Sequence, residues 1–141
     1  MRVVLDTSVL VAALRSPTGA SIALLDAALR GKIEILISTA LMLEYEAVLT
    51  RTEHLRVAEM TQEDVRRLLD AICRTATQVT VQWQWRPQLS DPDDEMVLET
   101  AINGHAHAIV TFNRSDFTPA AIGFGMMVLS PAEALGKVDI R

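Results

Sequence analysis

The sequence contains only one cysteine, Cys73, so an internal disulfide is excluded. Cys73 lies in an apolar helical pattern with no activating base nearby in sequence, and we expect a small buried hydrophobic residue rather than a reactive thiol. No apolar run approaches the roughly 18 residues of a membrane helix, and the apolar start ends at Asp6, too early for a signal-peptide core. These absences predict a cytoplasmic protein without membrane contact.

An excess of basic residues is also absent, because 13 Lys and Arg residues face 18 Asp and Glu residues and give a net charge of −5. This balance argues against a protein that grips nucleic acid by bulk charge. It allows an enzyme that presents carboxylates to metal ions, since bound cations invert the local charge. The sequence has no glycine-rich phosphate loop, and Asp6-Thr7-Ser8 lacks the Asp-x-Asp pattern of phosphoaspartyl hydrolases.

The 141 residues fit one domain, 1–141, and half of them are hydrophobic, which allows a sizeable core. Strand-like apolar runs alternate with helical patterns, which predicts an α/β fold with a largely parallel sheet covered on both faces. The expected strands are Arg2–Leu5, Ile33–Ile37, Gln78–Val81, Ala108–Thr111 and Met126–Leu129. The expected helices are Val9–Leu14, Ala20–Arg30, Ser38 to about Arg51, Thr61 to about Arg74, Asp91 to about Asn103 and a short helix opened by Ser130.

Acidic residues come from four separate segments near the ends of these strands. Asp6 directly follows the first strand, and Glu44 lies in the helix after the second. The other members are Asp91, Asp93, Asp94 and Glu95 at one helix start, with Asn113 and Asp116 after the strand Ala108–Thr111. Ligands bind at the carboxyl ends of the strands in such folds, so these groups should gather at one edge. Clustered carboxylates repel one another, and hard divalent ions that assist phosphodiester cleavage take such oxygen ligands.

Each acid also has a structural interpretation, which the sequence leaves open. Asp6 and Asp91 stand where helix N-caps are expected, and Asp93 is a first-turn acid that the helix dipole favours. Glu44 also suits a solvated helix face, and Asp116 suits a cap on a short turn.

Other polar and aromatic residues give weaker signals. His105 and His107 should face opposite ways with no third ligand nearby, which argues against a zinc site. Arg51 and Arg56 suit phosphate contacts and ordinary solvated positions equally well. A loop with Trp83, Trp85 and Arg86 suits base stacking, packing or partner binding.

Four blocks of the sequence, in order and spanning nearly the whole chain, resemble the PIN-domain family. The first is the apolar strand that ends in Asp6-Thr7, and the second is STALMLEYEAVL from Ser38 to Leu49 with its internal glutamate. The third is DPDDEMVLETA from Asp91 to Ala101, and the fourth is VTFNRSDF from Val110 to Phe117. The nearest subgroup is that of VapC-related toxin components of toxin–antitoxin pairs.

The resemblance implies a three-layer α/β/α fold with a five-stranded parallel sheet. It implies cleavage of single-stranded RNA that depends on Mg²⁺ or Mn²⁺ and leaves a 5′ phosphate and a 3′ hydroxyl. By position in the blocks, Asp6, Glu44, Asp94 and Asp116 match the family's catalytic and metal-binding acids. Thr7, Asp91, Thr111 and Asn113 match positions that assist them or the substrate.

Two positions depart from the subgroup, which often has aspartate where Asn113 stands and asparagine where Ser8 stands. The amide removes one negative charge, whereas the serine hydroxyl can still hydrogen-bond an acid. Three hypotheses therefore remain: an endoribonuclease, a nucleic-acid-binding module with a degraded site, and an interaction protein that pairs with a cognate antitoxin. By resemblance alone we also expect a homodimer.

Overall fold

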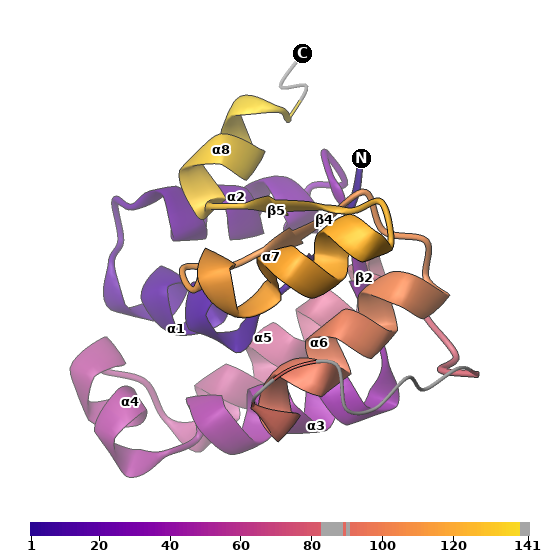
Figure 1. Ribbon diagram of the computed structural model, residues 1–141. Helices are drawn as coiled ribbons and strands as arrows, with labels where there is room; N and C mark the ends of the chain where they lie inside the picture. The colour runs from indigo at the N-terminus through magenta and orange to yellow at the C-terminus, as the bar shows by residue number, and fades with distance from the viewer. Residues whose placement is uncertain (83–88, 90, 139–141) are drawn as a thin grey trace.

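The computed structural model describes residues 1–82, 89 and 91–138, and its ribbon is shown in Figure 1. The proposed stacking segment with Trp83, Trp85 and Arg86 lies outside the described residues. The strands are β1 (Arg2–Leu5), β2 (Glu34–Ile37), β3 (Thr77–Gln78), β4 (Ala108–Val110) and β5 (Met127–Leu129). The helices are α1 (Thr7–Arg15), α2 (Ala20–Leu29), α3 (Thr39–Leu49), α4 (Thr52–Ala58), α5 (Gln62–Thr75), α6 (Pro92–Asn103), α7 (Arg114–Gly123) and α8 (Pro131–Gly136).

The five strands form one sheet in the order β3-β2-β1-β4-β5, and every pair is parallel. Crossovers between parallel strands are right-handed. The helices that connect β1 to β2 and β2 to β3 therefore cover one face of the sheet, and the helices that lead to β4 and β5 cover the other. The contacts agree in the main, because α6 packs on β1, β2 and β4 and on α7, whereas α1, α2, α3 and α5 pack among themselves. Helices α3 and α6 also contact each other. The predicted α/β fold with a five-stranded parallel sheet between helices is confirmed.

The direction of the connections reverses between β1 and β4, which are hydrogen-bonded neighbours at the centre of the sheet. In open parallel sheets, a crevice forms at the carboxyl ends of the strands at such a point. Asp6 and Thr111 are the residues that follow these two strands. The topology alone therefore places them side by side at the expected position of a site.

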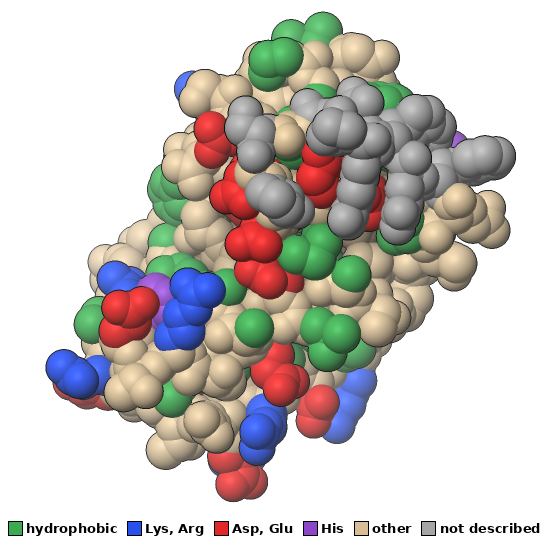
Figure 2. Space-filling model, turned by 60° about the horizontal axis from the view of Figure 1, so that its bottom comes forward, with side chains coloured by type: hydrophobic (Ala, Val, Ile, Leu, Met, Phe, Trp, Pro, Cys, Tyr) green, Lys and Arg blue, Asp and Glu red, His purple; other side chains and the backbone are tan. Residues whose placement is uncertain are grey.

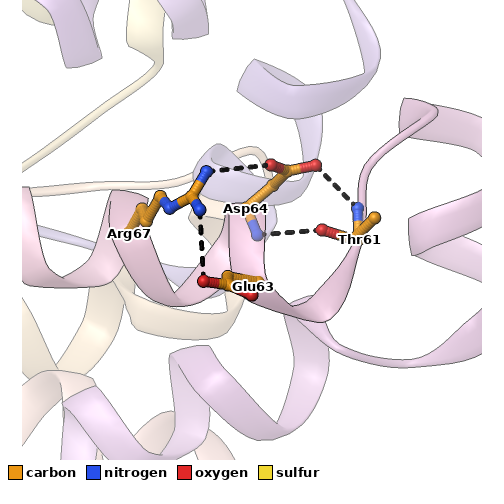
Figure 3. A network of polar contacts seen from close by, with 4 residues as sticks. All are labelled: Thr61, Glu63, Asp64 and Arg67. Atoms are coloured by element: carbon orange, nitrogen blue, oxygen red, sulfur yellow. Dashed lines mark hydrogen bonds and ion pairs between the residues drawn. The ribbon is translucent and has the colours of Figure 1, made fainter.

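Side-chain caps begin several helices where the sequence predicts them. Thr61 and Asp64 form a capping box at the start of α5, with Asp64 Oδ2 accepting from the Thr61 N–H at 2.9 Å and Thr61 Oγ1 accepting from the Asp64 N–H at 3.1 Å (Figure 3). Ser130 and Glu133 form a second box at α8. Ser38 caps α3 by accepting from the Leu41 N–H at 3.2 Å. Each cap satisfies backbone donors that the first turn of a helix leaves unpaired.

The hydrophobic core lies between the sheet and its helices and includes all but the first residue of β1 and β2 and the whole of β4. Tyr45 and Phe117 are the largest fully buried side chains. Gly104, which ends α6, has the closest neighbours among the glycines: an added Cβ would lie 2.7 Å from Leu36 Cδ1 and 2.8 Å from Val79 Cγ2. Only glycine lets the end of α6 approach β2 this closely.

Three parts of the fold differ from the sequence-based expectation. Two helices, α4 and α7, were not predicted: α4 buries no side chain, and α7 contains Pro119, which normally ends a helix. Strand β3 is Thr77–Gln78 rather than Gln78–Val81, because α5 ends at Thr75 and the ladder to β2 begins directly after it. The prediction of a buried Cys73 was wrong, since this residue is exposed one position past the buried Ile72.

No single helix among the described residues is long and apolar enough to cross a membrane. Helices α1 and α2 taken together have the length and apolar composition of a membrane span, but they meet at a bend of 106°.

Candidate functional site

Asp6 stands at the N-cap position of α1, but its side chain makes no capping hydrogen bond. Its Oδ2 atom instead accepts from two hydroxyls, Ser8 Oγ at 2.7 Å and Thr111 Oγ1 at 2.8 Å. The Asp6 backbone is fixed as well, since its N–H donates to the Val110 carbonyl at 2.9 Å. With only 7% of its surface exposed, Asp6 is a carboxylate held in one orientation by Ser8 of α1 and by groups at the end of β4.

Thr111 joins this carboxylate to the loop that follows β4. It is completely buried, and its Oγ1 accepts the N–H of Asn113 at 2.9 Å while donating to Asp6. The Phe112 N–H lies 3.4 Å from Ser8 Oγ. Both serine and threonine hydroxyls thus act as donor and acceptor at once, so the turn after β4 and the start of α1 form one rigid network around Asp6.

The start of α6 brings a second group of carboxylates to the same edge. Asp91 is the N-cap and accepts the Asp93 N–H at 2.9 Å, as its structural interpretation requires. The buried Glu95 accepts the Leu89 N–H at 2.8 Å and fixes the chain before the helix. Asp94 is half-buried between these residues.

Burial raises the pKa of Asp94 to about 6, and four neighbouring carboxylates add to the rise, in decreasing order Asp6, Asp91, Asp116 and Asp93. Like charges close together disfavour ionisation. Because these four acids come from β1, α6 and α7, their shared effect on Asp94 shows that the sheet edge gathers negative charge at this residue.

Glu44 reaches the edge from α3. Burial is the main cause that raises the pKa of Glu44, followed by the charge of Asp93, while the charge of Arg51 lowers it and Asp91 raises it. The neighbouring Tyr45 fixes α3 to β1, because its buried hydroxyl donates to the Leu5 carbonyl at 2.5 Å. The start of α3 is tied to α6 by a 2.8 Å hydrogen bond between the buried hydroxyls of Ser38 and Thr100.

The fourth segment contributes Asp116 and Asn113. Asn113 is the N-cap residue of α7, exposed and without a side-chain capping bond, and Asp116 is exposed in the first turn. A cavity of about 450 Å³ opens between α6 and α7. Its lining includes Asp91, Asp94 and Asp116, together with Leu89, Ser115, Pro119 and Ala120. Figure 2 shows acidic side chains gathered on this side of the molecule.

Whether these residues suit a divalent cation depends on donor chemistry and on spacing. The donors are carboxylates and hydroxyls, the hard oxygen ligands that Mg²⁺ and Mn²⁺ prefer, and the raised pKa of Asp94 marks a charge excess that a cation would offset. Within the described part of the chain, no three His, Cys, Asp or Glu side chains stand close enough to share one ion. The residues therefore fit a hard cation by chemistry and charge, and closure around it requires rotation of the more exposed side chains.

The structure thus places Asp6, Asp91, Asp93 and Asp116 near enough for their charges to act on Asp94, and it places Asp91 and Asp93 near enough to act on Glu44. Thr111 contacts Asp6 directly, and Thr7 is the half-buried first residue of α1. Sequence reasoning did not identify Tyr45 or the Ser38–Thr100 link as supports of this site. In the sequence, only position points to these residues: Tyr45 is next to the candidate acid Glu44, and Ser38 stands at a predicted helix start.

Comparison with known proteins identifies the family of the chain and its fold. A family model described as PIN domain matches residues 2–115, and the chain therefore belongs to the PIN-domain family. No curated protein matches the sequence. A chain of the crystal structure titled VapBC2 from Rickettsia felis, bound to a DNA fragment from their promoter, is similar over 92% of this chain and 98% of that chain, with a TM-score of 0.62 and 15% sequence identity. At this identity the similarity shows a shared fold.

Proposed function

We propose that this PIN domain is a metal-dependent endoribonuclease that hydrolyses phosphodiester bonds of single-stranded RNA. The observation that carries the proposal is the cavity lined by Asp91, Asp94 and Asp116 at the sheet edge where hydroxyls fix Asp6, next to the switch point of the sheet. Burial and the charges of neighbouring carboxylates raise the pKa of Asp94 there. Such a concentration of like charge is costly in a protein without a cation, and perturbed carboxylates in a cavity are typical of functional sites. VapC-type PIN domains are nucleases, and membership of the PIN family supports the same class of activity for this chain.

The proposed roles follow from the environment of each residue. Asp6, held by two hydroxyls, is the fixed ligand, and Asp94 is the ligand whose ionisation is coupled to cation binding. Glu44 and Asp116 complete the set from α3 and α7. Bound Mg²⁺ or Mn²⁺ would supply an activated water and stabilise charge on the phosphate. Thr111 orients Asp6, Asp91 holds the start of α6, and Thr7 and Asn113 face substrate or assist these acids.

Asn113 motivates a second candidate, an RNA-binding PIN domain without cleavage. The amide replaces a carboxylate that many members of the subgroup carry, and the structure places it exposed at the start of α7, on the same turn as Asp116. In this alternative RNA still binds, but the wild type does not cut it and Asp6→Asn leaves binding unchanged or improved.

The biological setting that we propose is a toxin paired with an antitoxin protein. The support is the PIN family together with the fold shared with a chain of a VapBC2 structure. We further propose a homodimer, as PIN-like proteins commonly form. Co-purification with the product of a neighbouring gene would support the pairing, and a monodisperse free monomer would count against both assemblies.

The test is cleavage of an end-labelled single-stranded RNA by the purified chain with Mn²⁺, with Mg²⁺ and with chelator. We expect metal-dependent products with a 5′ phosphate, lost in Asp6→Asn and retained in Asp26→Asn, a matched change at an exposed residue of α2. Retained cleavage by Asp6→Asn would contradict the site. Absence of cleavage by the wild type, with RNA binding intact, would favour the second candidate, and restoration by Asn113→Asp would then identify the cause.

A further inference from the structure

Helix α4 has no fully buried side chain, and Leu55 packs against the core while only partly buried. It contacts α1 and α3, the two helices that bring Asp6 and Glu44 to the site. Most residues of α4 are exposed, so its polar side chains face the surface beside these two helices.

His54 of α4 connects two arginines. Its Nδ1 atom lies 2.5 Å from Arg15 Nη2, at the end of α1, and its backbone N–H donates to the Arg51 carbonyl at 3.0 Å. A guanidinium can only donate, so Nδ1 is the acceptor and Nε2 carries the ring proton. The histidine therefore holds the Arg15 side chain without neutralising its charge.

Both arginines lie at the ends of helices that carry acids of the site. Helix α1 runs from Asp6 at its N-cap to Arg15 in its last turn. Arg51 lies just beyond the C-cap of α3, the helix that carries Glu44, and its charge acts on Glu44. Arg15, Arg51 and His54 thus form a basic strip where α1, α3 and α4 contact one another.

Three exposed arginines elsewhere are paired with carboxylates, whereas in the described part of the chain Arg56, Arg66 and Arg74 have no carboxylate within 4 Å. Arg67 contacts Glu63 and Asp64 (Figure 3), Arg30 contacts Asp26, and Arg114 contacts Glu133. Within residues 1–82, 89 and 91–138, neither Arg15 nor Arg51 has a carboxylate within 4 Å, although Glu53 and Glu59 are nearby in the α4 segment. Figure 2 shows basic side chains around a histidine on the same face as the acidic cluster.

We propose that the basic strip of Arg15, Arg51 and His54 binds the phosphate backbone of single-stranded RNA and guides it to the acidic site. This inference rests on the ribonuclease function proposed above. A chain of net charge −5 repels a polyanion, and the carboxylates at the site repel it most. A ribonuclease of this composition needs unneutralised cations beside its acids, and two guanidiniums with a ring N–H donor match the phosphate oxygens of a single strand.

The test is the salt dependence of RNA binding, measured by fluorescence anisotropy with a labelled single-stranded RNA of about 12 nucleotides in chelator, so that no cleavage occurs. The variants are Arg15→Gln with Arg51→Gln, and a control of equal charge change, Arg30→Gln with Arg74→Gln. Arg30 and Arg74 are exposed at the ends of α2 and α5. These helices lead into the amino ends of β2 and β3, whereas the acidic site lies at the carboxyl ends of the strands.

We expect the strip variant to bind RNA about tenfold more weakly, with the slope of log K against log salt shallower by about 1.4, because each phosphate contact on a single strand contributes roughly 0.7. The control should change affinity less than about twofold. In cleavage with Mn²⁺, the strip variant should raise KM and retain kcat.

Equal losses in the two variants, or an unchanged slope in the strip variant, would overturn the proposal. Unchanged RNA binding together with weaker binding of a polyglutamate peptide would assign the strip to an acidic protein partner instead. If the wild type cuts RNA and the strip variant behaves like it, only the strip proposal fails. If the wild type neither binds nor cuts RNA, the proposed function fails and the strip proposal with it.

Discussion

The Thr111 hydroxyl donates a 2.8 Å hydrogen bond to the Asp6 carboxylate, across the ends of the two strands between which the sheet connections reverse. The residues are 105 positions apart in sequence, yet each is fixed by the backbone ladder between β1 and β4. The orientation of the central acid is therefore a direct consequence of strand pairing and does not depend on a flexible loop.

Thr111→Val removes this hydrogen bond and the part-buried one in which Thr111 Oγ1 accepts the Asn113 N–H. We expect the free energy of unfolding to fall by about 1–2 kcal/mol and cleavage to fall further than stability explains. Thr111→Ser retains the hydroxyl and is the matched control. Urea unfolding and RNA cleavage measure the two effects, and a valine variant as stable and active as the serine variant would refute the role of Thr111.

The pH dependence of stability reports on Asp94. Because the folded-state pKa of about 6 is above the ordinary value of 3.8, the folded protein binds the extra proton between these values. The contribution to stability is full below about pH 4 and is lost as pH rises through 6. For this partly exposed group we expect about 1 kcal/mol or less.

Thermal unfolding of the metal-free protein in chelator, from pH 4 to pH 7.5, measures this effect. Asp94→Asn should flatten the decrease with pH and stabilise the protein at pH 7.5, whereas Asp26→Asn should keep the wild-type slope. Identical slopes in all three proteins would show that the carboxylate cluster does not act on Asp94.

Gly104→Ala tests the close approach of α6 to the sheet. The new Cβ would meet the buried Leu36 and the partly buried Val79 below 3.0 Å, so we expect a loss of about 1–3 kcal/mol in urea unfolding. At Gly123 an added Cβ meets nothing within 4 Å, and Gly123→Ala should be neutral or slightly stabilising. A neutral Gly104→Ala would mean that the α6–β2 contact is looser than these distances show.

The sequence predicted the five strands, their parallel pairing and most helices because burial periodicity and caps are local signals. It did not predict α4, which has no buried face, or α7, where Pro119 lies inside the helix and removes one backbone donor. Pro119 is nevertheless accommodated, and Phe117 and Ala121 on the same helix are fully buried. Contacts with other parts of the fold determine whether segments such as α4 and α7 form helices, and no local sequence pattern predicts these contacts.

For the site, the sequence indicated which acids follow strands but not how they are oriented. The two interpretations of Asp91 both needed geometry, and the structure shows it capping α6 while it adds to the charge around Asp94. The hydroxyl network at Asp6 depends on a residue 105 positions away, and the link from Arg15 to His54 depends on one 39 positions away. Such relationships arise from the fold as a whole.

The most direct test of a cation site at this edge is a calorimetric titration of the metal-free protein with Mn²⁺ at pH 6. We expect the wild type and Asp26→Asn to bind Mn²⁺ with release of protons, because binding must displace the proton that Asp94 holds at its raised pKa of about 6. Asp94→Asn should bind at least tenfold more weakly and release fewer protons. Equal Mn²⁺ affinity and equal proton release in Asp94→Asn and the wild type would contradict the assignment of this carboxylate cluster as the metal site.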